Sequence, residues 1–129
     1  MKRFSGVLLL IVCAVGGAYA QGPPSEHKSD QAPVVEVVGC LSQTGADWIL
    51  TKAGDPAVTS TSFTTPEEVK AAAEKPLGAR QYRLIGASPF TPESHKGHKL
   101  VVKGLLTKSG SDPGINLTSF QMLSETCAK

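Results

Sequence analysis

The sequence of 129 residues has few aromatic side chains and none of the common catalytic motifs. Aromatic residues make up 5% of it. It contains no G-x-S-x-G elbow, no H-E-x-x-H zinc motif and no phosphate-binding P-loop. Its acidic residues are scattered, and only Glu67 and Glu68 are neighbours, where a helix start explains them. A Ser–His–Asp set could be assembled from Ser88, His95 and Asp112, but any chain this rich in serine permits such a set. We therefore expect no enzyme activity and no cofactor.

The only long apolar run lies at the N-terminus, and it is too short to predict a membrane span. Lys2 and Arg3 precede an apolar stretch over residues 7–15, and Ala18 and Ala20 supply the small residues of a cleavage site. This pattern is typical of a secretory signal peptide over residues 1–20, cleaved before Gln21. The alternative is an uncleaved anchor. After cleavage we expect no transmembrane segment and an exported protein, periplasmic or extracellular.

The chain lacks an excess of charge once the signal peptide is removed. Of 13 lysines and arginines, Lys2 and Arg3 leave with it, and the remaining 11 match the 11 aspartates and glutamates. A neutral domain lacks the positive surface of nucleic-acid-binding proteins and of proteins held on anionic membranes. We therefore expect no nucleic acid as partner. The lysines at 96, 99, 103 and 108 are expected on the surface, where they discourage pairing of sheet edges.

Cysteine is also scarce, with three in the chain. Cys13 lies within the signal peptide. Cys40 and Cys127 remain, and an even pair in a small exported domain predicts one structural disulfide. Free or metal-binding thiols are an alternative. A redox pair is another, although such cysteines usually lie close together in C-x-x-C.

Residues 21–33 contain three prolines and almost no apolar side chains. This composition predicts a flexible tail ahead of a single domain over residues 34–129. Within that domain, alternation of apolar and polar residues predicts five strands. A slip in the alternation of the last strand predicts a bulge near Ser119. The strands are expected over residues 34–42, 47–52, 80–86, 98–108 and 115–123.

Two short helices are expected between these strands. Thr65 is a good N-cap, Pro66 suits the first helical position, and Glu68 completes a capping box. This helix is predicted to end at about Lys75, because Pro76 follows, and to lie on the surface of the sheet. A second helix of one or two turns is expected over residues 89–97.

Three predicted strands share one pattern: apolar, any residue, apolar, any residue, glycine. The pattern occupies residues 35–39, 82–86 and 100–104. Glycine inside a strand indicates a bulge or a sharp bend, which a small closed sheet requires. The predicted fold is therefore mainly β, a small and strongly curved five-stranded barrel with one or two short helices.

The order of these elements resembles the OB-fold, a five-stranded Greek-key barrel with a helix between its third and fourth strands. Residues 95–104, a polar turn followed by alternating apolar residues and Gly104, resemble the start of the fourth strand in bacterial OB-like domains. With the Gly39-Cys40 pair in its first strand, the chain is similar to small exported bacterial domains of uncharacterised function. The resemblance implies no catalytic residues.

The resemblance implies a binding face on the second and third strands of the barrel. That face would include Trp48, Arg80, Tyr82 and Arg83, with residues 109–112 at its rim. Arginine beside aromatic residues suits a small ligand such as a sugar or a peptide. We therefore expect an exported, non-enzymatic binding or interaction module with an unknown small ligand, present as a monomer.

Two alternative functions are compatible with the sequence. One is a structural or accessory envelope domain, tethered by its tail and acting through a protein partner. The other is a weak metal-handling protein that uses His95 and His98, since two imidazoles three residues apart can bind copper or zinc. No third ligand is adjacent; His27 and Glu93 are the nearest possibilities in sequence.

Overall fold

The computed structural model describes residues 32–108 and 113–127. The predicted signal peptide, most of the predicted tail and the loop over residues 109–112 lie outside the described residues. None of the described helices has the length and apolar composition that a membrane crossing requires.

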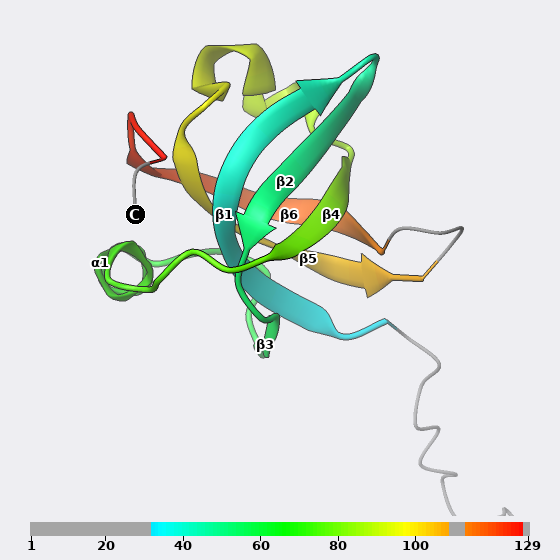
Figure 1. Cartoon of the computed structure of the whole chain (residues 1–129). Coiled ribbons are helices and arrows are strands. Elements are labelled where there is room, and N and C mark those ends of the chain that lie inside the picture. Colours follow the sequence, from blue (N-terminus) through cyan, green and yellow to red (C-terminus); the bar gives the residue numbers. More distant parts are fainter. Residues whose placement is uncertain (1–31, 109–112, 128–129) are drawn as a thin grey trace, which may run out of the picture.

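The described part is mainly β, as predicted, and all five predicted strands are present within two residues of their expected ends (Figure 1). A two-residue strand in the long connection after the second strand was not predicted. The second predicted helix is instead a pair of 3₁₀ turns. The elements are β1 (Val34–Thr44), β2 (Asp47–Ala53), β3 (Ala57–Val58), α1 (Pro66–Ala73), β4 (Arg80–Ile85), η1 (Ser88–Phe90), η2 (Pro92–His95), β5 (Lys99–Thr107) and β6 (Gly114–Ser124).

Five of the strands form a closed ring in the order β1, β2, β4, β6, β5 and back to β1. β1 closes the ring because it is long enough to pair with two neighbours: Cys40–Thr44 pairs with β2, and Val34–Cys40 pairs with β5. All ring pairs are antiparallel except β4 with β6, which is parallel. β3 pairs only with β1, at Val35 and Glu36.

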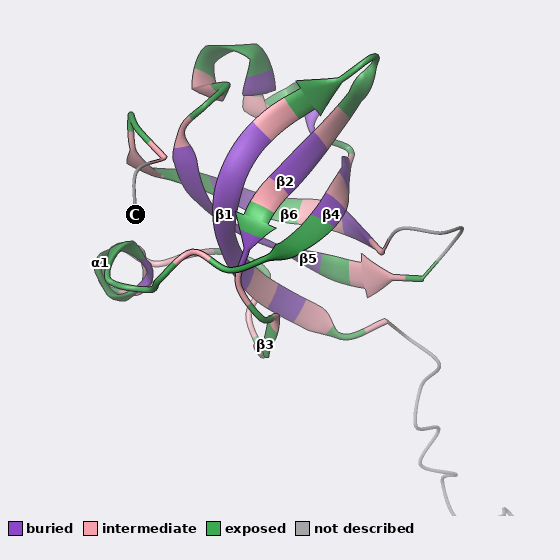
Figure 2. Cartoon of the chain, in the orientation of Figure 1, coloured by how far each residue is buried: buried purple, intermediate pink, exposed green. Residues whose placement is uncertain are grey.

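The core fills the inside of the ring. Alternate residues of each strand point inward. Figure 2 shows continuous buried segments along β1, β2 and β5, because parts of the outer face are covered as well. Full burial of one such aliphatic side chain is worth about 1.5–3 kcal/mol, so the ring depends on this cluster for its stability. The buried members are Val35, Val37, Leu41, Leu50, Ala53, Tyr82, Leu84, Leu100, Val102, Ile115 and Phe120.

Two glycines of the repeated pattern lie inside strands, at points where neighbouring backbones come close. A Cβ on Gly39 would lie 2.7 Å from Leu50 Cγ and 2.9 Å from the Thr51 carbonyl oxygen. A Cβ on Gly104 would overlap the Asn116 carbonyl. The prediction is wrong for Gly86, which follows the last residue of β4 with a φ of +74° and turns the chain out of the sheet.

The bulge predicted near Ser119 is present in β6. Lys103 of β5 is opposite Ser119, but the next residue, Gly104, is opposite Leu117, so Thr118 is the extra residue. The bulge increases the local bend of β6, which lies between β4 and β5 in the ring.

Helix α1 lies outside the ring and packs on the outer face of β6 and β5, with Val38 of β1 beside it. The predicted capping box is confirmed, because the Thr65 side chain accepts from the Glu68 backbone N–H and Glu68 accepts from the Thr65 N–H. The helix ends at Ala73, two residues earlier than predicted. Its only fully buried residue, Ala72, packs against Val38 and Val101.

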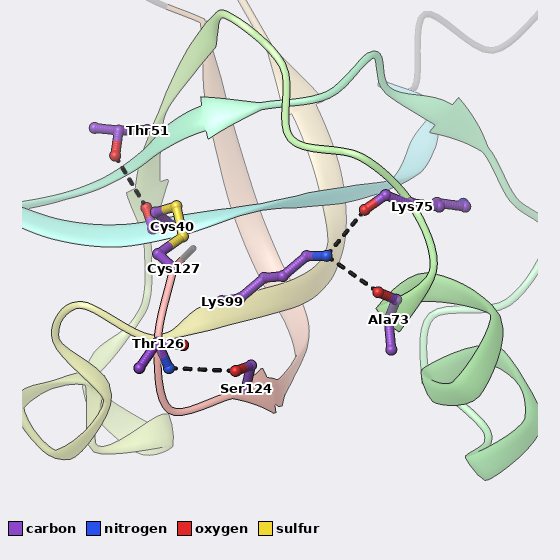
Figure 3. Close-up of a disulfide and its surroundings, with 8 residues drawn as sticks. All are labelled: Cys40, Thr51, Ala73, Lys75, Lys99, Ser124, Thr126 and Cys127. Atoms are coloured by element: carbon purple, nitrogen blue, oxygen red, sulfur yellow. Dashed lines mark hydrogen bonds between the residues drawn. A yellow bond between two sulfur atoms is a disulfide. The ribbon is translucent and has the colours of Figure 1, made fainter. Parts of the chain in front are cut away.

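Two lysines of β5 hold this helix in place, and both were wrongly expected on the surface. Lys99 is 9% exposed, and its Nζ donates to the carbonyl of Ala73 at 3.1 Å, at the end of α1, and to that of Lys75 at 2.9 Å, just after the helix (Figure 3). Lys103 is fully buried, and its Nζ donates to Glu68 Oε1 at 2.9 Å near the first turn. Hydrogen bonds from these two ammonium groups thus hold both ends of α1 against β5.

The Lys103 ammonium also fixes the segment that leads into α1. It donates to Thr61 Oγ1 and to the Phe63 carbonyl, each at 2.8 Å. Glu36 Oε2 lies 3.9 Å away and adds a second negative charge. With these partners the buried charge is compensated, which its burial requires.

The predicted disulfide between Cys40 and Cys127 is confirmed, with a Cα–Cα distance of 5.7 Å (Figure 3). It joins the outer face of β1 to the segment after β6. Next to it, Thr51 Oγ1 of β2 donates to the Cys40 carbonyl at 3.3 Å.

Candidate functional site

Three of the four residues of the predicted binding face lie on the core-facing side of the sheet, and only Arg83 points outward. Tyr82 is 3% exposed and belongs to the core cluster, and Trp48 is half-buried and packs against the same cluster. Arg83 alternates with Tyr82 and Leu84 along β4, so it points away from the core. Arg80 lies exposed at the start of β4. Burial raises the pKa of the Tyr82 phenol, which keeps that ring a neutral core group.

An open hollow of about 550 Å³ lies on the outer face of β1, and Arg80 is the one predicted ligand residue that lines it. Its walls are the end of β2 and the chain that leaves α1. Charged and apolar groups alternate around it, among them Glu36, Val38, Asp55, Lys75, Leu77 and Arg80.

A second hollow of about 480 Å³ adjoins the first, because Pro76, Leu77 and Gly78 line both. Its other lining residues are Lys52 and the disulfide-bonded Cys127. The two hollows therefore lie on either side of residues 76–78, and the disulfide borders the second hollow.

Glycines let this segment cross the end of β2. The Gly78 N–H donates to the Lys52 carbonyl at 2.9 Å, and the Gly54 N–H donates to the Val38 carbonyl at 2.9 Å. A Cβ on Gly78 would overlap the Ala53 carbonyl, so only glycine allows the close approach. Lys52 itself has a φ of +48°, at the point where the pairing of β2 with β4 is irregular.

The charged groups of the first hollow form two ion pairs. Lys75 Nζ lies 2.9 Å from Glu36 Oε1, and Arg80 Nε lies 2.6 Å from Asp55 Oδ1. The hydrogen bond and the charge of Asp55 raise the pKa of Arg80 further above its already high value, so it remains a cation. The two cations stay accessible, with side chains 46% and 59% exposed.

Each cation keeps donors that its ion pair does not use. An ammonium has three N–H donors and a guanidinium has five, whereas one contact to a carboxylate is recorded for each of Lys75 and Arg80. The hollow therefore presents N–H donors of two positive groups beside an apolar surface that includes Leu77 and Val38. Such a surface suits a small ligand with a negative group and a short apolar part.

Sequence reasoning found Arg80 but missed the residues that accompany it. Glu36, Asp55 and Lys75 belong to a strand, a loop and the end of a helix, and no motif connects them. They meet because Lys99 holds the chain after α1 against β5. The one signal in the sequence was Pro76 and Gly78, which indicate an irregular connection after the helix.

The two histidines of the described residues are brought together, with 3.3 Å between their Nδ1 atoms. His95 ends η2 and His98 precedes β5. In the described part of the chain, no group of three or more histidine, cysteine, aspartate or glutamate side chains is arranged to hold a metal ion. Glu93 therefore does not complete a three-ligand group with them, and His27 lies outside the described residues.

Two large apolar side chains are exposed on the connection between β2 and α1. Val58 of β3 is 77% exposed and Phe63 is 61% exposed. The backbone between Val58 and Phe63 is held in place, because the buried Lys103 ammonium donates to Thr61 Oγ1 and to the Phe63 carbonyl.

Comparison with protein-family models finds no match to this chain, and comparison with curated proteins finds none.

Proposed function

We propose that this protein is an exported, non-enzymatic binding module that holds a small anionic ligand in the hollow beside Arg80. The observation that carries the proposal is the pair of accessible cations, Lys75 and Arg80, at an open hollow of about 550 Å³. That volume lies within the range of about 300–1,000 Å³ typical of small-molecule sites.

We further propose that the ring is an OB-like barrel. Three features support this: the ring order, the single parallel pair between β4 and β6, and the position of η1 and η2 between the third and fourth ring strands. In OB-folds the ligand lies on the second and third strands, here β2 and β4. The hollow instead lies on β1, beside the connection that contains α1, a departure from the minimal fold.

Export is supported by the signal-peptide pattern of residues 1–20 and is compatible with the disulfide between Cys40 and Cys127. A binding role is supported by the lining of the hollow, where the carboxylates of Glu36 and Asp55 hold the two cations in place through ion pairs.

The ligand class follows from the donors. A carboxylate accepts two parallel N–H donors from arginine, and the apolar surface near Leu77 accepts a short hydrocarbon group. A peptide C-terminus and a uronic acid both have this chemistry, and the sugar and peptide classes expected from the sequence include them.

The test compares a free carboxylate with its neutral amide. Alanyl-leucine, its C-terminal amide and glucuronate are titrated into the exported protein, and backbone amide NMR signals are followed. We expect a carboxylate probe to shift the signals of residues 75–80, and the amide to leave them unchanged. Arg80→Gln should abolish the shifts.

Arg83→Gln is the matched control, because it removes the same charge from the outward face of β4, the face that OB-folds use. Retained binding in Arg83→Gln with loss in Arg80→Gln supports the hollow. Loss only in Arg83→Gln would move the site to β4, and shifts by none of the three probes would refute an anionic ligand.

A second candidate function, docking to a protein partner, is favoured by the exposed side chains of Val58 and Phe63. The Lys103 contacts fix the backbone that presents Phe63, which reduces the entropy lost on binding. If this surface docks a partner, Phe63→Ser should reduce crosslinking of the protein in its native envelope, and Arg80→Gln should not.

A further inference from the structure

His95 and His98 form a preorganised pair at one end of the ring, close to η2. Their Nδ1 atoms are 3.3 Å apart, and their ring planes are inclined by 77° with centroids 5.4 Å apart. Both residues are half-buried, so the pair is partly shielded from water but remains open to it. This site is separate from the hollow beside Arg80 and shares no residue with it.

Backbone contacts fix the turn that carries the two imidazoles. The Gly97 N–H donates to the Leu41 carbonyl at 2.8 Å, and the Leu41 N–H donates to the His98 carbonyl at 3.0 Å. Gly97 has a φ of +84°, which favours glycine and directs the chain back towards β1. The two histidines therefore flank Gly97, whose backbone is hydrogen-bonded to β1 of the closed sheet.

The imidazole of His95 is also held in place by packing against aromatic side chains. Its centroid lies 5.4 Å from that of Phe120 in an edge-on arrangement, and Phe120 stacks on Phe90 at 5.7 Å. Both phenylalanines pack in the core cluster. The position of the His95 imidazole is thus set by the core, which limits the rearrangement that a ligand requires.

The separation of the two nitrogens matches a tetrahedral metal site. Two imidazole nitrogens bound to zinc at about 2.0–2.1 Å and at the tetrahedral angle are about 3.3–3.4 Å apart. Two adjacent ligands in a square-planar site would be only about 2.8 Å apart. The observed 3.3 Å agrees with the first arrangement.

We propose that His95 and His98 bind Zn²⁺ through their Nδ1 atoms, with water completing the coordination. Without the metal, one Nδ1–H donates to the other Nδ1, so one imidazole has its proton on Nδ1. On zinc binding the Nδ1 proton is given up to solvent and Nε2 of the same imidazole takes one up, so both imidazoles then have their proton on Nε2, stay neutral and release no net proton. Since the described residues supply no three-ligand group, the site is weaker than a structural zinc site.

The test is titration of the exported protein with zinc chloride by calorimetry, together with side-chain NMR of the imidazole nitrogens. We expect one zinc per chain and a change in both Nδ1 signals to those of metal-bound nitrogen. His98→Gln and His95→Gln should each weaken binding by at least about tenfold. His98→Gln is the more informative variant, because His95 also packs on Phe120.

His27→Gln is the matched control, since residue 27 holds the third histidine of the sequence. Its zinc affinity should equal that of the unaltered protein. Backbone amide NMR spectra of all variants verify that the closed sheet is intact. No zinc binding by the unaltered protein, unchanged affinity in a folded His98→Gln, or an equal loss in His27→Gln would each overturn the proposal.

Discussion

At the scale of single residues, the buried ammonium of Lys103 makes a large contribution to stability. Its side chain has no exposed surface, and its partners come from three places: Glu36 on β1, Glu68 on α1 and the segment over residues 59–63. Removing the ammonium takes a buried positive charge away from Glu36 and Glu68 and removes short hydrogen bonds to Thr61, Phe63 and Glu68, which costs more than the loss of a surface ion pair.

We predict that Lys103→Met lowers the free energy of unfolding by about 2–4 kcal/mol, because it removes a buried charge together with its three short hydrogen bonds. Urea denaturation measures the change. Lys108→Met removes the same group from an exposed position and should change stability by less than about 0.5 kcal/mol. Equal effects of the two substitutions would show that the Lys103 contacts contribute nothing specific.

The Glu68 carboxylate gives this network a pH dependence. The Thr65 backbone N–H and the Lys103 ammonium both donate to it, and they hold the pKa of Glu68 below its ordinary value of 4.5. A lowered pKa means that the charged form is favoured in the folded state. Its stabilisation is therefore present above the unfolded pKa and is lost as pH falls through the folded pKa.

We predict that Glu68→Gln is less stable than the unaltered protein at neutral pH, and that the difference narrows as pH falls below 4.5. Urea denaturation over the acid range measures both curves. Glu67→Gln is the control, since Glu67 is its exposed neighbour. A difference that stays constant with pH would contradict the assigned role of the Glu68 charge.

The sequence could not reveal that Lys99 and Lys103 are buried. In β5 they alternate with Leu100 and Val102, and this pattern is typical of a strand with one face in solvent. They are buried because the connection between β2 and β4 returns across that face and places α1 on it. No local pattern specifies where such a connection lies.

At the scale of elements, local signals predicted most of the fold. The Thr65–Glu68 capping box predicted where α1 begins, and the slip in alternation predicted the bulge at Thr118. Both depend on contacts between residues close in sequence, which is why they can be recognised. β3 was missed because two residues are too few for a periodic pattern, and its pairing with β1 depends on the closed ring.

The backbones of β5 and β6 come close together at Gly104, so a substitution of this glycine tests their packing. Because a Cβ on Gly104 would overlap the Asn116 carbonyl, Gly104→Ala should lower the free energy of unfolding by about 3 kcal/mol or more. Gly45→Ala is the control: its φ is +62° but its surroundings are open, so it should cost about 1–2 kcal/mol. Urea denaturation of both variants measures the difference. A smaller cost for Gly104→Ala than for Gly45→Ala would refute the close approach.

At the scale of the whole molecule, the disulfide is a covalent link between distant parts of the described chain. It joins Cys40 to Cys127 across 87 positions of sequence, and the scarcity of cysteine was enough to predict it. The candidate site could not be predicted in the same way. Arg80 meets Lys75 and Glu36 only through the path of the chain around the ring, and that path has no counterpart in a sequence motif.

We predict that the double substitution Cys40→Ala with Cys127→Ala lowers the free energy of unfolding by up to about 4–5 kcal/mol, the value that the chain-entropy model gives for a loop of this length. Urea denaturation of the double variant and of the oxidised protein measures the loss. A reductant should destabilise the oxidised protein and leave the variant unaffected. Equal stability of the two proteins would contradict a stabilising role for the disulfide.

The ring order has a consequence for how the chain acquires its structure. β6 follows all other strands in sequence, yet it lies between β4 and β5, and Cys127 follows β6. A chain that crosses a membrane from its N-terminus therefore presents an incomplete sheet and a single thiol on β1 until residues 114–127 emerge. If the chain is exported, as proposed, closure of the sheet and formation of the disulfide can therefore be completed only after translocation.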